Sequence, residues 1–205
     1  MNTWERQSWL SAATLESMTE VNEEVLALLQ VQCRAADLKP PLLQDVSDLL
    51  LNLDTASMHR AAGTAVLLVD AGFVHGSQWS DAIIGAVNDR ERPGPQAFFT
   101  VDAAVRVMRL VMTHAWHLAR SEPAAARLLL GLSATNVAVI GGCSLTRLIG
   151  LAEVRTPWLR PRWEHRPALW RELLRTATAG DAGALERLRV RGLQLLAAEA
   201  RASGP

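Results

Sequence analysis

An arginine- and tryptophan-rich segment spans residues 155–175 of this 205-residue chain. Arginine binds phosphates and carboxylates strongly, and tryptophan offers a broad surface for stacking and for burial at protein interfaces. The segment therefore indicates contact with a partner protein or with nucleic acid. The alternative is a set of core tryptophans whose surface is covered by arginine stems. The candidate binding residues are Arg155, Trp158, Arg160, Arg162, Trp163, Arg166, Arg171 and Arg175.

Residues that could catalyse a reaction or hold a metal are scattered along the chain. His114 and His117 have a spacing that can hold a metal, but no Asp, Glu or Cys nearby completes a site, so we expect surface histidines. Asp70 follows an apolar run, and we expect it to cap backbone amides in a turn. The sequence contains no phosphate-binding loop, Gly-x-Ser-x-Gly motif or zinc-ligand cluster. We therefore predict a protein that is not an enzyme and uses no metal or cofactor.

Net charge is zero overall but is unevenly divided along the chain. Residues 1–100 hold 6 basic and 13 acidic side chains, whereas residues 101–205 hold 15 basic and 8 acidic ones. Either the two halves attract each other, or the basic half faces an acidic partner.

Composition and targeting signals are those of a bacterial-type, cytoplasmic protein. Hydrophobic residues make up 49% of the chain, enough for a proper core. Cys33 and Cys143 lie far apart among apolar residues, where free cysteine behaves as a small hydrophobe. The first residues lack the basic and apolar regions of a signal peptide, and the apolar runs are too short to span a membrane. We expect no membrane contact.

Helical spacing of apolar residues dominates the pattern and predicts an all-α fold with short extended arms. Asp54 and Ser144 are typical helix N-caps, and Gly131 is a typical C-cap. Residues 66–69 form a short strand or a buried extended segment, and the prolines in 157–167 favour an extended arm. We expect helices over residues 11–34, 45–53, 55–62, 101–121, 124–130, 133–140, 144–153, 169–177 and 184–201, and a short helix that starts at Trp79.

Similar residues recur at a spacing of about ninety positions. This spacing predicts two related halves rather than short solenoid repeats. The alternative is chance agreement between pairs of amphipathic helices. We predict helical halves at 1–92 and 101–205, packed together and joined by a Pro- and Gly-rich linker at 93–100. The matched pairs are Leu50/Ile140, Leu53/Cys143, Met58/Leu148, Ala62/Ala152, Leu68/Trp158 and Phe73/Trp163 at a spacing of 90, and Trp79/Trp170 at 91.

The stretch from Glu122 to Trp163 resembles the bacterial flagellar regulator subunit FlhD. The resemblance rests on a small-residue helix that ends in Leu-Gly-Leu, a short helix before Ser-Leu, a Leu-Ile-x-Leu-Ala-Glu helix and an arm that closes on Arg-Trp. These motifs lie at residues 130–132, 144–145, 148–153 and 162–163. The first half resembles the family more faintly, through Val21-Asn22 and the arm at 67–73.

Members of that family are helical, form dimers and act with a zinc-binding partner subunit, FlhC, at promoters. The resemblance implies a tandem FlhD-like transcriptional regulator subunit whose halves pair as a pseudo-dimer. Promoter DNA would be reached through an FlhC-like partner, and a homo-oligomer is compatible with this expectation. Family members are about half as long, and some carry an arm cysteine that residues 158–163 lack. The alternative is a non-enzymatic helical adaptor or scaffold that binds a secretion- or mobile-element-associated protein without contacting DNA.

Overall fold

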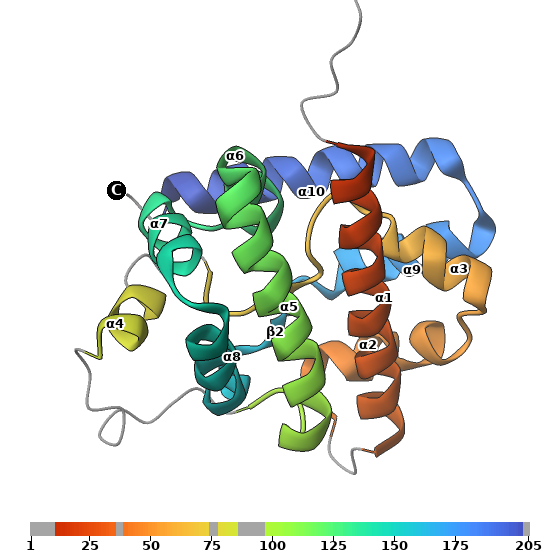
Figure 1. Cartoon of the computed structure of the whole chain (residues 1–205). Helices are drawn as coiled ribbons and strands as arrows, with labels where there is room; N and C mark the ends of the chain where they lie inside the picture. Colours follow the sequence, from red (N-terminus) through yellow and green to blue (C-terminus); the bar gives the residue numbers. More distant parts are fainter. Residues whose placement is uncertain (1–10, 36–38, 74–77, 86–96, 203–205) are drawn as a thin grey trace, which may run out of the picture.

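The computed structural model describes residues 11–35, 39–73, 78–85 and 97–202, and these form an all-α fold, as predicted (Figure 1). The helices are α1 (Ala12–Ala35), α2 (Pro41–Leu51), α3 (Thr55–Ala62), α4 (Gln78–Ile84), α5 (Val101–Ser121), α6 (Pro123–Leu130), α7 (Ala134–Gly142), α8 (Leu145–Val154), α9 (Pro167–Ala179) and α10 (Ala182–Ala202). A short 3₁₀ helix, η1 (Thr156–Trp158), and two short strands, β1 (Val69–Asp70) and β2 (Arg160–Pro161), complete the described elements.

Local capping chemistry sets several of the helix boundaries. Asp54 accepts a hydrogen bond from the backbone N–H of Ser57 at 2.7 Å, which starts α3 and lowers the pKa of the Asp54 carboxyl. Ser144 accepts the equivalent bond from the N–H of Arg147 at 3.4 Å and starts α8. Gly131, with φ 72°, ends α6 in the left-handed conformation that glycine adopts without strain.

Helices α1 and α5 form an antiparallel pair at the centre of the molecule (Figure 1). Near one end of the pair, the Thr14 hydroxyl donates to Glu122 Oε1 at 2.6 Å. Near the other end, Arg106 donates to the Glu24 carboxylate. This contact joins the acidic first half to the basic second half, so part of the uneven charge is satisfied within the fold.

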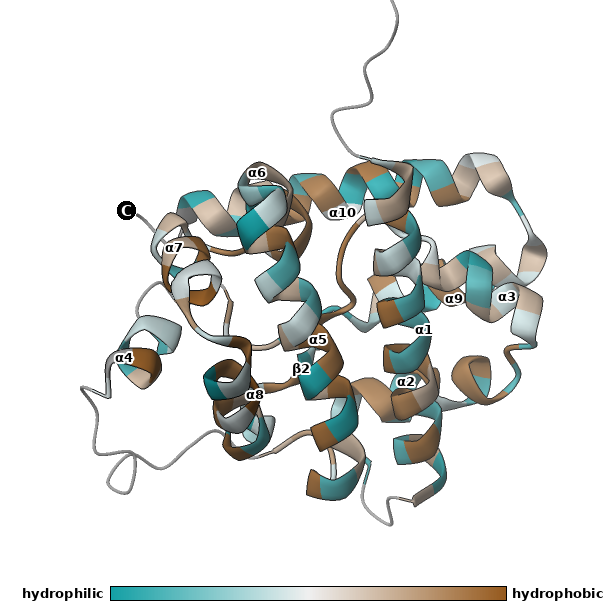
Figure 2. Ribbon diagram, in the orientation of Figure 1, coloured by the Kyte–Doolittle hydropathy of each residue, from teal (hydrophilic) through white to brown (hydrophobic). Residues whose placement is uncertain are grey.

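The other helices flank the central pair in two groups. Helices α2 and α3 pack against α1 and are covered by α9, whereas α7 and α8 pack against α5 and are flanked by α4. Each group therefore receives its outer helix from the opposite half of the sequence. The apolar sides of the helices face inward (Figure 2), and one continuous cluster of buried apolar residues includes both halves.

The two arms cross at the centre and pair with each other. Strands β1 and β2 are antiparallel, with Val69 opposite Pro161 and Asp70 opposite Arg160. Asp70 also accepts the N–H of Phe73 at 2.9 Å, which confirms the predicted turn cap. Asp70 and Arg160 are 90 residues apart, and Val69 and Pro161 are 92 apart, as antiparallel pairing requires.

A matching hydrogen bond follows each arm. Trp79 Nε1 donates to the carbonyl oxygen of Ala71 at 2.8 Å, and Trp170 Nε1 donates to that of Arg162 at 2.8 Å. Donor and acceptor are eight residues apart in both cases, and both indole rings are buried. The spacing between the two bonds is 91, which is the spacing at which the sequence matches Trp79 with Trp170.

The predicted equivalence of Phe73 and Trp163 is wrong, and this counts against a repeat at a spacing of 90. Phe73 lies in the main core, whereas Trp163 belongs to a small separate cluster with Val66 and Leu196. Gly72, which lies 91 residues before Trp163, shares its left-handed backbone, with φ angles of 76° and 55°.

The expected linker at 93–100 is described only in part, since residues 93–96 lie outside the described residues. In the remainder, Phe98 and Phe99 are buried with their rings 4.8 Å apart, so this part contributes to the core. Among the described helices, none is by itself long and apolar enough to cross a membrane; only the pair α7 and α8, bent by 117°, meets the length and composition criteria together.

Candidate partner-binding surface

The structure divides the predicted arginine–tryptophan surface into buried and exposed parts. Arg162 is buried in the middle of the crossing arms. Its guanidinium donates to the carbonyl oxygens of Leu67 at 2.9 Å, Val69 at 3.2 Å and Leu130 at 2.8 Å. Burial lowers the pKa of Arg162, while two nearby carboxylates oppose that shift. The prediction that Arg162 contacts a partner is wrong, because its donors hold together three segments of the fold.

Trp163 is also buried and is held by the last helix. Its Nε1 donates to Glu199 Oε1 of α10 at 2.7 Å, and Glu199 Oε2 lies 3.8 Å from Arg162 Nη1. Trp163 packs with Leu196 of the same helix. The prediction of partner contact is therefore wrong for Trp163 as well, since this ring docks α10.

Two further arginines from the predicted set form ion pairs near the surface. Arg160 makes two hydrogen bonds to the Glu164 carboxylate, at 2.6 and 2.9 Å. Arg171 of α9 lies 3.4 Å from Asp45 of α2, which again joins the basic half to the acidic half. Half-exposed pairs of this kind contribute little net stability.

Trp158 and Arg155 form the one aromatic–arginine stack of the predicted set that reaches the surface of the described structure. Trp158 is half-buried, with its ring edge-to-face against Trp79 at a centroid distance of 5.2 Å. The Arg155 guanidinium lies 5.0 Å from the centre of the Trp158 ring. Burial lowers the pKa of Arg155. Stacks of this composition are frequent at the energetic centres of protein interfaces.

The remaining two candidates are exposed: Arg166 directly precedes α9, and Arg175 lies in its C-terminal part. Nine residues separate them, which is about 13 Å along a helix. The eight predicted residues thus do not form one continuous surface, because Arg162 and Trp163 lie inside the protein.

Sequence reasoning missed two residues that matter at these positions. Val154, at the end of α8, is 63% exposed beside the Arg155–Trp158 stack. Glu199 lies on the same side of α10 as Leu196 and Gly192, and that shared helical face is the signal that could have identified it.

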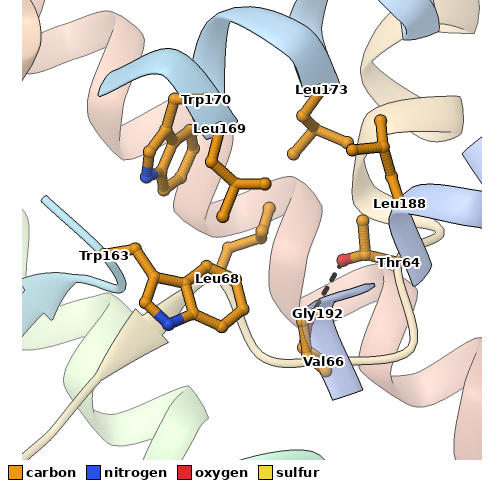
Figure 3. A pocket seen from close by; sticks show the side chains of 9 residues that line it. All are labelled: Thr64, Val66, Leu68, Trp163, Leu169, Trp170, Leu173, Leu188 and Gly192. Carbon is orange, nitrogen blue, oxygen red and sulfur yellow. Dashed lines mark hydrogen bonds between the residues drawn. The ribbon is translucent and has the colours of Figure 1, made fainter. Parts of the chain in front are cut away.

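A small apolar cavity of about 20 Å³ lies between the first arm, α9 and α10 (Figure 3). Its size is close to that of one water molecule, so it reflects imperfect packing rather than a ligand site. The lining residues are Thr64, Val66, Leu68, Trp163, Leu169, Trp170, Leu173, Leu188 and Gly192.

His114 and His117 do not belong to a metal-binding group in the part of the chain that the structure describes. His114 is buried with Nδ1 3.1 Å from Ser17 Oγ, and burial, helped by the neighbouring His117, lowers its pKa to about 4. The expectation of a surface side chain is wrong for His114, although His117 is exposed. Within the described ranges, no group of three or more His, Cys, Asp or Glu side chains could hold a metal ion.

The fold and surface define a helical protein with two interlocked groups of helices. The sequence matches no protein-family model, and no curated protein or solved structure is significantly similar to it.

Proposed function

We propose that this chain is a tandem FlhD-like transcriptional regulator subunit that acts by binding another protein. In this proposal, its two halves pair within one polypeptide, and a zinc-containing, DNA-binding FlhC-like subunit contacts the promoter. The resemblance of residues 122–163 to that family supplies the function, and no catalytic step, metal or cofactor of this chain is involved.

The tandem part of the proposal rests on the two matching tryptophan hydrogen bonds. Trp79 and Trp170 each donate to a carbonyl eight residues earlier, and each lies on a helix that packs against the opposite half. A chain with two related halves would place equivalent donors and acceptors in this way. A closed pair with two-fold symmetry would also exchange its outer helices reciprocally.

A helical adaptor that does not contact DNA is the second candidate, and the placement of the arginines favours it. Arg162 is internal, and Arg160 and Arg171 are engaged with carboxylates of the same chain. Fewer arginines of the predicted set are therefore free to neutralise phosphates than the sequence indicates.

Co-purification from native cells followed by a gel shift across a salt series separates the two proposals. The regulator proposal predicts a zinc-bearing second subunit and a shift of selected DNA fragments that weakens as salt rises. Recovery with a protein assembly that lacks zinc, and no shift at low salt, would support the adaptor and contradict the regulator.

A further inference from the structure

Helix α10 has 21 residues, lies along one edge of the molecule and packs against α9 and α6 (Figure 1). Leu188 is the one buried apolar residue that α10 adds to the main cluster of the described residues. Leu196 belongs instead to the small separate cluster with Val66 and Trp163. The main core is therefore built by the other helices, and α10 covers it from outside.

The first arm, Trp163 and α9 form an apolar groove beneath α10 (Figure 3). The groove is narrow where α10 passes the arm, because a Cβ atom at Gly192 would lie 3.3 Å from Val66 and 3.6 Å from Trp163. The inner side of α10 meets it with Leu188, Gly192 and Leu196, at intervals of four residues. A helix that fills this groove therefore needs an apolar stripe with a glycine at its centre.

The groove also needs a carboxylate from the helix that fills it. Trp163 Nε1 donates to Glu199 Oε1 of α10 at 2.7 Å. An empty groove would expose apolar surface and deprive the indole of this acceptor, and both changes are unfavourable. A released α10 is therefore replaced best by a helix that supplies the same stripe, glycine and carboxylate, and α10 of a second copy supplies all three.

A two-residue turn, Gly180 and Asp181, joins α9 to α10. Gly180 has a left-handed φ of 71° and donates to Ala177 O at 3.3 Å, and Asp181 donates to Thr176 O at 3.4 Å. These bonds end α9 in a Schellman motif. Asp181 also caps α10, because its carboxylate accepts the N–H of Ala184 at 2.9 Å. If both turn residues became helical, α9 and α10 would form one continuous helix, and α10 would point away from its own body.

Arg60 of α3 stabilises the closed turn. Its Nε donates to Ala177 O at 2.7 Å. In a continuous helix, this carbonyl would instead accept the N–H of Asp181, four residues later. Opening of the turn therefore exchanges one set of hydrogen bonds for another and leaves the α9 carbonyls with partners.

We propose that the groove accepts α10 of a second copy of this chain, so that two copies exchange these helices reciprocally. The exchanged helix makes the same contacts in the second copy that it makes in its own, so the closed chain itself shows the fit. Exchange of an identical element is a low-cost route to a dimer, since only the turn changes conformation. The inference goes beyond the proposed function and does not depend on it, because it involves neither DNA nor a zinc-containing subunit.

Gly180→Ala tests the turn by sedimentation velocity of the full chain. Alanine is strained in the left-handed turn and favours a continuous helix, so the dimer association constant should rise at least about tenfold. Gly183→Ala is the matched control, because it adds the same methyl group within α10, where the nearest atom is Asp181 Oδ1 at 3.5 Å. This control should leave the association constant unchanged, and far-UV circular dichroism would establish that both variants keep the helical fold.

A cysteine pair identifies which chain fills the groove. Val66→Cys and Gly192→Cys are close enough for a disulfide, because a Cβ atom at 192 lies 3.3 Å from the Val66 side chain. The oxidised dimer of the Gly180→Ala chain with this pair should run as a disulfide-linked dimer on a non-reducing gel. The same chain with Val66→Cys alone should not.

A surface charge pair provides a second measurement that leaves the groove intact, and it decides the question where the cysteine pair fails to fold. Arg191 of α10 lies 2.9 Å from Glu172 of α9, and both are half-exposed. Glu172→Arg and Arg191→Glu are placed in separate Gly180→Ala chains, which are then mixed. Exchange of α10 restores opposite charges only between the two chains, so native mass spectrometry should show mixed dimers above their statistical share.

Three results would overturn the inference. One is a Gly180→Ala chain that stays monomeric, and another is an equal rise in association for Gly183→Ala. The third is a dimer whose cysteine pair links only within each chain, or whose charge variants mix at the statistical share.

This inference and the proposed function fail separately. An exchanged dimer without a zinc-bearing partner or a promoter shift would contradict the regulator proposal alone. A promoter complex formed by a chain that stays monomeric with Gly180→Ala would overturn the exchange of α10 alone.

Discussion

Replacement of Arg162 by methionine tests whether this arginine serves the fold rather than a partner. Methionine keeps much of the length and apolar volume but removes every donor. The carbonyl oxygens of Leu67, Val69 and Leu130 would then be buried without the guanidinium that they now accept from. Loss of a hydrogen-bond partner costs about 1–3 kcal/mol for each buried group, and removal of a buried charge offsets part of the sum. We expect the free energy of unfolding to fall by about 3–5 kcal/mol.

Urea unfolding followed by far-UV circular dichroism measures this change, with the slope against urea used to check that the same surface is exposed. Arg166→Met is the matched control, since Arg166 is exposed four residues away and should change stability by less than about 0.5 kcal/mol. Arg162→Lys should lie between them, because an ammonium cannot reproduce the planar fork. A loss below about 1 kcal/mol for Arg162→Met would refute the reasoning.

Three other perturbations have expected outcomes. Trp79→Phe and Trp170→Phe should each lower the free energy of unfolding by about 1–3 kcal/mol in urea titrations, because each leaves a buried carbonyl without its donor; clearly unequal losses would argue against equivalent roles. Gly150→Ala should raise the melting temperature, since the added Cβ meets nothing within 4 Å and alanine favours a helix by about 1 kcal/mol. Gly141→Ala should gain less, because its Cβ would lie 3.3 Å from the Ala119 carbonyl oxygen. His114 has a pKa of about 4 in the folded state, below its ordinary 6.5, so the unfolded chain binds this proton first and stability should fall between pH 6.5 and 4. His114→Gln should flatten that part of the measured pH profile, and an unchanged slope would contradict the assignment.

Most helix boundaries could be predicted because their causes are local, although the helix expected over 45–53 begins at Pro41 and ends at Leu51. Asp54 and Ser144 cap helices at the expected residues, and the helix expected over 101–121 begins at Val101 and ends at Ser121. Each of these features depends on side chains within three or four positions in sequence. The buried extended segment at 66–69 was equally visible as a short apolar run between polar neighbours.

The roles of individual arginines could not be predicted from sequence, because they depend on long-range crossing of the arms. Arg160 and Arg162 are two residues apart in similar surroundings, yet Arg160 binds Glu164 near the surface and Arg162 binds carbonyls inside. The difference arises from the first arm, about ninety residues earlier in the chain, whose carbonyl oxygens at Leu67 and Val69 bind Arg162. The same long-range packing separates Phe73 from Trp163, because Phe73 lies in the main core and Trp163 packs with Leu196 of α10.

The two matching tryptophan hydrogen bonds help to distinguish a duplicated segment from chance similarity. Two unrelated amphipathic helix pairs would share apolar spacing, because any buried helix face requires it. Such unrelated pairs are not expected to share an indole that donates to a carbonyl eight residues earlier. This hydrogen bond forms only where an arm and the helix that follows it lie against each other. Gly72 and Trp163 have left-handed backbones at the same place in the two halves, although a tryptophan gains nothing from that conformation. A duplicated segment would produce this agreement, and it supports the proposed tandem more strongly than the apolar pattern does.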